Sequence, residues 1–352
     1  MKLQKIAGIM FIIFMVVAIL ILAKSIILPL ILAIFLWFLI KEIREFMDKS
    51  NWIKTKVKKW LKTIVASVFL ILILGLITSL LIQNANKLSS AIPNYTMNLD
   101  KISQNIESNF GFNITEKINN YSGELDFQSL ITTFLDSISE LFSYAFMIIL
   151  YLLFILMEES TFSRKMKAIY SKSEDFEKIN GLLYKIDYSL GKYISIKTLL
   201  SLITAVLSYI ALLILQIDFA IFWAFCIFIL NYIPSIGSLV ATLFPAAMAL
   251  IQYGGTDFMP FIYVLVLVGS IQLFVGNFLE PKMMGNSLNI SSLVVILSLS
   301  VWGVIWGVIG MVLSVPITVM MIIVFSNFES TKKVAILLSE KGIINTKKLN
   351  HE

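Results

Sequence analysis

The sequence contains very little of the chemistry that most enzymes use. Its only histidine is His351, one residue from the end, and its only cysteine is Cys226, inside an apolar run. Histidine-dependent catalysis and intramembrane metal sites therefore have no partner residues, and a disulfide framework is excluded. No glycine-rich phosphate-binding loop is present. We expect a protein that is not an enzyme and that uses no cofactor and no metal.

Charge is also scarce. Only 14% of the 352 residues are charged and 58% are hydrophobic, whereas an ordinary soluble domain has about 25% and roughly 45–50%. A single large water-soluble core is excluded, because the chain has too little polar surface to cover it. Lipid must therefore be the solvent for much of the surface.

The apolar residues are clustered into long uncharged segments. A membrane-spanning helix needs roughly 20 such residues, and in hydrocarbon the backbone must satisfy its own hydrogen bonds. The sequence therefore predicts an all-α, polytopic transmembrane helical bundle. The first run is longer than the apolar region of a cleaved signal peptide, so we expect it to be retained as a helix. The uncharged runs are 6–23, 25–40, 63–86, 141–157, 198–217, 219–256, 258–279 and 283–328.

Basic residues indicate the orientation. They are concentrated in segments 41–62 and 158–197 and in the C-terminal tail, whereas segment 87–140 has three lysines against seven acidic residues. The positive-inside rule places the basic segments and both termini in the cytoplasm and segment 87–140 outside. Because each basic segment lies beside an apolar run, we expect contact with anionic lipid headgroups and no nucleic acid. Lysine outnumbers arginine by 26 to 2, which is typical of an A/T-rich bacterial genome and favours a bacterial cytoplasmic membrane.

Two segments are polar but keep apolar residues at helical spacing. Segment 87–140 is expected to form a small outer insertion of short helices, interrupted at Pro93 and Gly111. Segment 160–196 is expected to form amphipathic helices on the inner leaflet. The outer insertion is interpreted as a cap or an oligomer contact.

Each of the two longest runs has helix-breaking residues near its middle. Run 219–256 is broken between Asn231 and Ser238, and run 283–328 contains three glycines between 303 and 310. The arms on either side of each break are too short to span about 30 Å, which predicts two re-entrant hairpins. Each hairpin follows a full span, and the two spans run in opposite directions, so the two units form an inverted repeat. The alternative is that both runs are pairs of ordinary tilted helices with packing glycines.

Polar residues at the hairpins are the candidate binding groups. Their amides, hydroxyls and freed carbonyls suit a small polar solute or a stripped monovalent cation, although simple helix capping is the alternative role. The candidate binding residues are Asn231, Pro234, Ser235, Gly237, Ser238, Asn277, Glu280 and Asn286. The candidate hinge residues are Pro245, Pro281, Gly285, Gly303, Gly307, Gly310 and Pro316.

Glu280 is the best candidate for a functional carboxylate, because charges within the spans are almost absent. It follows a long span and precedes Pro281. It could bind a cation or take up a proton. The alternative is a helix-end carboxylate paired with Lys282 at the inner interface.

Three ordered motifs resemble those of the autoinducer-2 exporter-like permease family. They are PSIG at 234–237 with Pro245 after it, NFLEPKMMG at 277–285, and GVIWGVIGMVLSVP at 303–316. The resemblance covers about 180–328 most fully. The family often shows glycine-glutamine where this chain has Ile196-Lys197, and a glycine-proline turn where it has 216–218; these departures bear on the substrate rather than on the fold.

The resemblance implies a homo-oligomeric permease that exports a small signalling molecule such as autoinducer-2 by alternating access. A sodium(lithium)/proton antiporter is the alternative within transport, and a non-transporting membrane scaffold is the alternative outside it. The predicted organisation has N-terminal helices with a basic loop over 1–86, the outer insertion over 87–140, a span with inner-surface helices over 141–197, the transport core over 198–328 and a cytoplasmic tail over 329–352.

Overall fold

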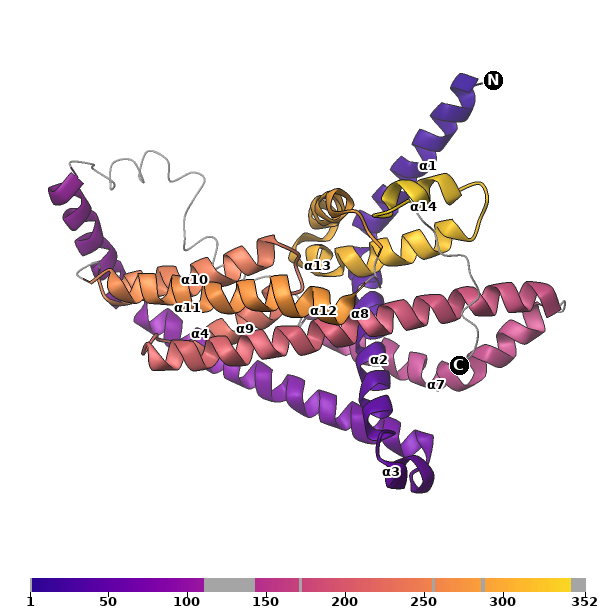
Figure 1. Cartoon of the computed structure of the whole chain (residues 1–352), viewed down its shortest axis with the longest axis horizontal. Helices are drawn as coiled ribbons and strands as arrows, with labels where there is room; N and C mark the ends of the chain where they lie inside the picture. The colour runs from indigo at the N-terminus through magenta and orange to yellow at the C-terminus, as the bar shows by residue number, and fades with distance from the viewer. Residues whose placement is uncertain (1, 111–142, 171–172, 255–256, 286–288, 343–352) are drawn as a thin grey trace. The chain divides into compact units, whose positions relative to one another are not determined.

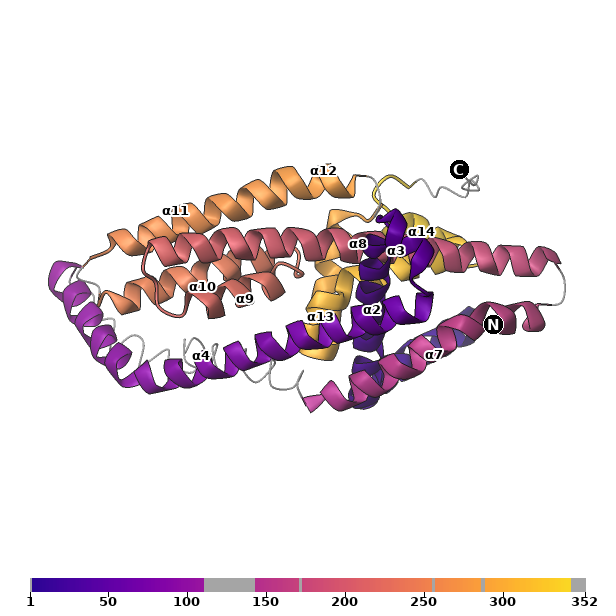
Figure 2. The ribbon, with the colours of Figure 1, turned by 90° about the horizontal axis from the view of Figure 1, so that it is seen from below.

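The computed structural model describes residues 2–110, 143–170, 173–254, 257–285 and 289–342. These residues form helices and no strands, which confirms the all-α prediction (Figures 1 and 2). The chain divides into two compact units. Unit 1 comprises Met1–Lys58, Asp136–Ser195 and Asn286–Glu352, and unit 2 comprises Lys59–Leu135 and Ile196–Gly285.

Six helices in the described ranges are long and apolar enough to cross a membrane. Three helices are apolar but shorter: Met10–Leu22, Ala220–Leu230 and Ile236–Gln252. Many large apolar side chains on these helices are exposed, as expected of surfaces that face lipid. The six candidate spans are Lys24–Met47, Lys59–Ile77, Ala145–Ile169, Phe176–Ile214, Met259–Met284 and Ser292–Ser326.

The first two apolar runs follow one another almost without interruption. Helix α1 (Lys2–Leu22) and helix α2 (Lys24–Met47) are separated only by Ala23. The amide of Ala23 donates to the carbonyl of Ile19, and the amide of Ile27 donates to the carbonyl of Ala23. Helical hydrogen bonding therefore continues on both sides of Ala23, and the chain does not reverse direction there (Figure 1).

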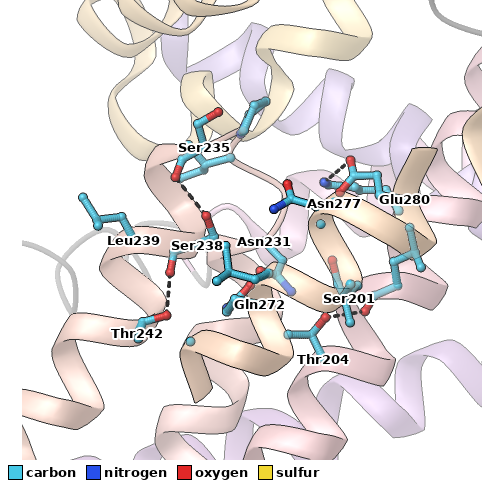
Figure 3. A pocket seen from close by; sticks show the side chains of 18 of the residues that line it. Ser201, Thr204, Asn231, Ser235, Ser238, Leu239, Thr242, Gln272, Asn277 and Glu280 are labelled. Carbon is cyan, nitrogen blue, oxygen red and sulfur yellow. Dashed lines mark hydrogen bonds and ion pairs between the residues drawn. The ribbon is translucent and has the colours of Figure 1, made fainter. Parts of the chain in front are cut away.

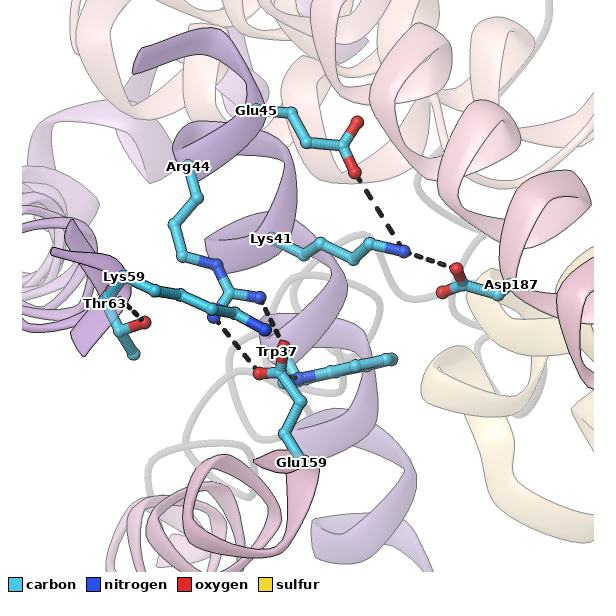
Figure 4. Close-up of polar contacts among 8 residues, drawn as sticks. All are labelled: Trp37, Lys41, Arg44, Glu45, Lys59, Thr63, Glu159 and Asp187. Atoms are coloured by element: carbon cyan, nitrogen blue, oxygen red, sulfur yellow. Dashed lines mark hydrogen bonds and ion pairs between the residues drawn. The ribbon is translucent and has the colours of Figure 1, made fainter. Parts of the chain in front are cut away.

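A charged cluster within unit 1 joins α2, α7 and the N-terminal part of α8 (Figure 4). Arg44 of α2 is buried, and its guanidinium donates two hydrogen bonds of 2.9 and 3.1 Å to the carboxylate of Glu159 on α7 (Ala145–Ile169). The indole of Trp37 donates to the same carboxylate at 3.1 Å. One turn of α2 away from Trp37, Lys41 pairs with Asp187 on α8 (Ser173–Ile214). Bidentate arginine–carboxylate geometry fixes orientation as well as charge, so α2 and α7 are held in one register.

Helix α13 (Ser292–Ser326) folds back on itself at Gly307, whose φ of 66° and ψ of −146° are not helical. The Ser298 hydroxyl on the first arm donates to the carbonyl of Ser314 on the second arm, so the arms run side by side. The break lies within the predicted stretch 303–310. At the end of the first arm, Trp306 belongs to one apolar cluster with Leu28 of α2, and the Trp306 indole donates to the Leu20 carbonyl of α1 at 3.0 Å.

Because Trp306 directly precedes the break at Gly307, its contacts place the end of the first arm of α13 against α1 and α2. The C-terminal helix α14 (Lys332–Leu338) packs against α13, and the short helix α3 (Asn51–Lys56) follows α2. Pro316 lies in the second arm and does not end it.

Helix α4 (Lys59–Phe110) belongs to unit 2 and continues far beyond its apolar part. The prediction of a break at Pro93 is wrong, because the helix passes through that position. A proline inside a helix removes one hydrogen bond and bends the axis, and neighbouring turns can still continue the helix. The predicted break at Gly111 lies outside the described residues.

Two side chains of α4 bind the ends of neighbouring helices in unit 2. The Tyr95 hydroxyl donates to the Asp218 carboxylate at 2.8 Å, and the Asn98 amide donates to the carbonyls of Ile251 and Gln252. Partial burial and the neighbouring Asp218 carboxylate raise the pKa of Tyr95 above its ordinary value near 10. The phenol therefore stays neutral and keeps donating throughout the physiological pH range.

Candidate functional site

Helix α8 carries a line of polar side chains through an apolar sequence. Lys197, Ser201, Thr204 and Ser208 recur at intervals of three or four residues, which places them on one face. All four are buried, with exposures of 7%, 1%, 0% and 0%. Burying polar groups costs free energy unless they find partners. This face therefore marks a place where the interior of unit 2 is polar.

The second wall of the site is the break between α9 (Ala220–Leu230) and α10 (Ile236–Gln252), at the place predicted from the proline and glycine. Ser235 has a φ of 59° and a ψ of −55°, and the Ile236 amide donates to the Pro234 carbonyl at 2.6 Å. This is a γ-turn of the rare, strained type. Such strain costs of order 1–3 kcal/mol and occurs preferentially at functional sites.

Close packing across the break requires Gly237. A Cβ atom at this position would lie 1.8 Å from the carbonyl oxygen of Leu230, so α9 and α10 approach one another through bare backbone. The Ser238 hydroxyl donates to the Ser235 carbonyl and the Thr242 hydroxyl donates to the Ser238 carbonyl, each at 2.9 Å. The start of α10 therefore presents polar side chains beside the strained turn.

The third wall is a helix with a π-helical turn. Helix α11 (Met259–Phe274) continues through the π turn η1 (Val275–Leu279) into α12 (Glu280–Met284). Pro281 has no N–H, so the usual bond to the Asn277 carbonyl cannot form. The Glu280 amide instead donates to the Val275 carbonyl, five residues earlier. π turns are frequent at functional sites, because they re-aim the side chains of one helical turn.

These three walls enclose a cavity of about 550 Å³. This volume lies within the range of roughly 300–1,000 Å³ that is usual for small-molecule sites. Figure 3 shows Ser238 and Thr242 on one side of the cavity and Asn277 and Glu280 on the other. The polar lining residues are Lys197, Ser201, Thr204, Asn231, Ser235, Ser238, Thr242, Gln272, Asn277 and Glu280.

Lys197 and Glu280 are the two charged residues of this lining and form an ion pair. The Lys197 Nζ lies 2.6 Å from the Glu280 Oε1, and the side chains are 9% and 29% exposed. The alternative pairing of Glu280 with Lys282 is therefore wrong. The π turn directs Glu280 toward α8, whereas Lys282 is exposed.

Two buried polar atoms of the lining have no hydrogen-bond partner among the described residues. They are the Oγ of Ser201 and the Nε2 of Gln272, and Gln272 is 92% buried. An unsatisfied buried donor costs about 1–3 kcal/mol, so native structures rarely keep one without a solvent or ligand partner. Because both side chains line the cavity, a molecule bound there is the candidate partner for these two groups.

The sequence matches the family model of AI-2E family transporters over residues 9–330. The chain belongs to the AI-2E transporter family. Family membership and the apolar helices together make the protein a multi-pass membrane transporter, and the resemblance stated from the three motifs is confirmed.

Similar proteins include members with transport functions in their names. The AI-2 transport protein TqsA of Escherichia coli (strain K12) is 30% identical over 324 residues, 90% of each chain. A Haemophilus influenzae protein named "Putative transport protein" is 31% identical over 330 residues, 91% of each chain. A sodium-lithium/proton antiporter of Halobacillus andaensis is 24% identical over 227 residues, 61% of each chain.

The structure brings together six of the eight candidate binding residues of this AI-2E family member. Asn231, Pro234, Ser235, Ser238, Asn277 and Glu280 line the cavity of unit 2. Gly237 is buried and serves the packing of the turn, and Asn286 lies outside the described residues. Of the candidate hinge residues, those from 303 to 316 belong to unit 1.

Five polar lining residues are not among the site residues predicted from the sequence: Lys197, Ser201, Thr204, Thr242 and Gln272. The positive-inside rule places Lys197 in the cytoplasm, because it is the last basic residue of segment 158–197. The spacing of Ser201, Thr204 and Ser208 was the pattern that could have revealed a polar face on span 198–217. Gln272 is the most polar side chain of α11 and stands alone in an apolar run.

Proposed function

We propose that the protein is a permease that moves a small, uncharged, polar solute, and that the solute binds in the cavity of unit 2. The unpaired Ser201 hydroxyl and Gln272 amide are the main support, because a bound solute would supply the partners that these buried atoms lack. The two charges of the lining belong to one ion pair, so the cavity offers hydrogen bonds without net charge.

Export of autoinducer-2 or of a similar signalling molecule is the specific form of this proposal. It is supported by the name of the relative TqsA, an AI-2 transport protein. Hydroxyl and amide groups would suit such a solute, since a site built to hydrogen-bond rejects analogues that lack the matching groups. The strained turn at Ser235 and the break at Gly307 are proposed as the two points at which alternating access bends the chain.

The proposal is tested by thermal stabilisation of the purified full chain in detergent with a panel of small polar solutes that includes autoinducer-2. We expect saturable stabilisation by at least one uncharged solute. Gln272→Leu should weaken that binding by about tenfold or more, because it removes an amide donor from the cavity. Gln83→Leu on the exposed surface of α4 is the matched control and should leave binding unchanged. If the two variants bound the solute with equal affinity, the solute would not bind in this cavity.

A sodium(lithium)/proton antiporter is the second candidate. The Glu280 carboxylate in the cavity favours it, as does the name of the Halobacillus relative. It predicts that Glu280→Gln abolishes sodium-driven proton flux in membrane vesicles. Unchanged flux in this variant would exclude Glu280 from such a mechanism.

The orientation and the assembly stay predictions. We propose a bacterial cytoplasmic membrane protein with segments 41–62 and 158–197 and the C-terminus in the cytoplasm, supported by the basic residues of these segments. The predicted cytoplasmic N-terminus would need two opposite crossings by runs 6–23 and 25–40, whereas the helical hydrogen bonds continue through Ala23. A homo-oligomer is the expected assembly, with membrane lipids as the surrounding partners.

A further inference from the structure

The ion pair of Lys197 and Glu280 lies in the wall of the cavity rather than on an exposed surface. Lys197 is 7% exposed, and its Nζ reaches the Glu280 Oε1 at 2.6 Å. Lys197 lies on α8 and Glu280 on α12, and the two residues are 83 positions apart in the sequence. A long side chain with considerable rotamer freedom is therefore held in one place, and its ammonium points at the carboxylate.

Without Lys197, the surroundings of Glu280 would suit a monovalent metal cation. The carboxylate shares the cavity lining with the Asn231 and Asn277 amides and with the Ser201 hydroxyl, all of which offer oxygen atoms. Oxygen ligands with one negative charge are what hard cations prefer. Lys197 is the one cationic residue of the lining, so its ammonium alone neutralises this position.

We infer that Lys197 is a built-in cation, whose ammonium fills the position at Glu280 that a sodium or lithium ion would otherwise occupy. A second cation beside the ammonium would meet like-charge repulsion, which is stronger at a partly buried position than in bulk water. The cavity therefore takes its solute without a co-bound metal cation. This last consequence rests on the proposed function, whereas the cation site itself does not.

Removing one partner of a buried ion pair leaves an uncompensated charge, which is strongly unfavourable. In the Lys197→Gln variant, a mobile cation bound at the Glu280 carboxylate would restore the charge balance. The latent site should therefore become visible when the lysine is removed.

The test is the melting temperature of the purified full chain in detergent, measured at pH 9 in sodium chloride and in choline chloride at equal ionic strength. The wild type should show no sodium-selective difference. Lys197→Gln should gain a saturable, sodium-selective rise of about 2 °C or more at pH 9. The double variant Lys197→Gln with Glu280→Gln should lose that rise, because the carboxylate is gone.

Two results would overturn the inference. The first is saturable, sodium-selective stabilisation of the wild type that Glu280→Gln removes, because a metal cation would then bind beside Lys197. The second is a folded Lys197→Gln variant that shows no sodium effect at pH 9. If Lys197→Gln does not fold, the first of these results, which is measured on the wild type, can still overturn the inference. Failure of the solute panel with Gln272→Leu would leave these cation measurements intact, so the two ideas fail separately.

Discussion

Glu158 and Glu159 are neighbours on α7 whose carboxylates lie in different surroundings. Glu159 accepts three hydrogen bonds, two from the buried Arg44 and one from Trp37, and its side chain is 17% exposed. Glu158 pairs with Lys165 in the open, where the two side chains are 47% and 62% exposed. Burial decides which of these two ion pairs contributes to stability.

We expect Glu159→Gln to destabilise the protein by about 3 kcal/mol, because it removes the carboxylate charge that the buried Arg44 guanidinium contacts with two hydrogen bonds. The measurement is loss of helical circular dichroism during denaturation in detergent micelles. Glu158→Gln is the matched control one residue away, and we expect almost no change. Equal effects of the two substitutions would show that the buried cluster does not hold α2 to α7.

The role of Lys197 could not be predicted from the sequence. Its position beside other basic residues indicated a cytoplasmic charge, and only the folded chain brings it to Glu280 on another helix. The candidate status of Glu280 could be predicted from the scarcity of carboxylates in apolar runs. Its partner could not, because the π turn at 275–279 changes the direction of the side chains that follow it.

At the scale of the element, the two helix breaks depend on glycine for different physical reasons. Gly237 is required by packing, since a Cβ would meet the Leu230 carbonyl oxygen at 1.8 Å. Gly307 has open space around it, but its φ of 66° and ψ of −146° lie in a region that is essentially confined to glycine. Substitutions at the two positions should therefore destabilise the protein for different reasons.

Gly237→Ala should force α9 and α10 apart at the turn, because backbone atoms cannot move aside as a flexible side chain can. We expect a clear fall in melting temperature together with loss of solute-dependent stabilisation. Gly75→Ala on α4 is the control, since its Cβ would meet no atom within 4 Å. Solute binding that survives Gly237→Ala unchanged would contradict the role of this turn in shaping the cavity.

Gly307→Ala should cost about 1–3 kcal/mol through backbone strain alone. Because Gly307 belongs to unit 1 and the cavity to unit 2, we expect the melting temperature to fall while the affinity of the detergent-solubilised protein for the solute is kept. Melting curves with and without solute measure both quantities. A variant as stable as the wild type would mean that the second break does not need this conformation.

The positions of both breaks could be predicted from proline and glycine, whereas several boundaries could not. A proline marked the turn before α10, yet Pro93, Pro245 and Pro316 lie within helices. A proline removes one donor, and whether the helix then ends depends on the packing of its neighbours. The charged Lys24 likewise predicts a boundary between the first two apolar runs. In the structure, the helical backbone hydrogen bonds continue from α1 into α2.

At the scale of the whole molecule, composition alone decides the class of the protein. The excess of apolar residues and the lack of charge require lipid contact, and the family model over residues 9–330 identifies a transporter. The predicted inverted repeat would relate the hairpin of α9 and α10 to the folded α13. These hairpins belong to different units, so the repeat stays a prediction.

The most direct test is counterflow of a radiolabelled solute, identified by thermal stabilisation, into proteoliposomes preloaded with the unlabelled compound. We expect the wild type to accumulate label transiently. Ser238→Trp should abolish this accumulation, because the indole would fill the cavity from the start of α10. Leu213→Trp, on the exposed surface of α8, should transport like the wild type. Full counterflow in Ser238→Trp would contradict the placement of the solute in this cavity.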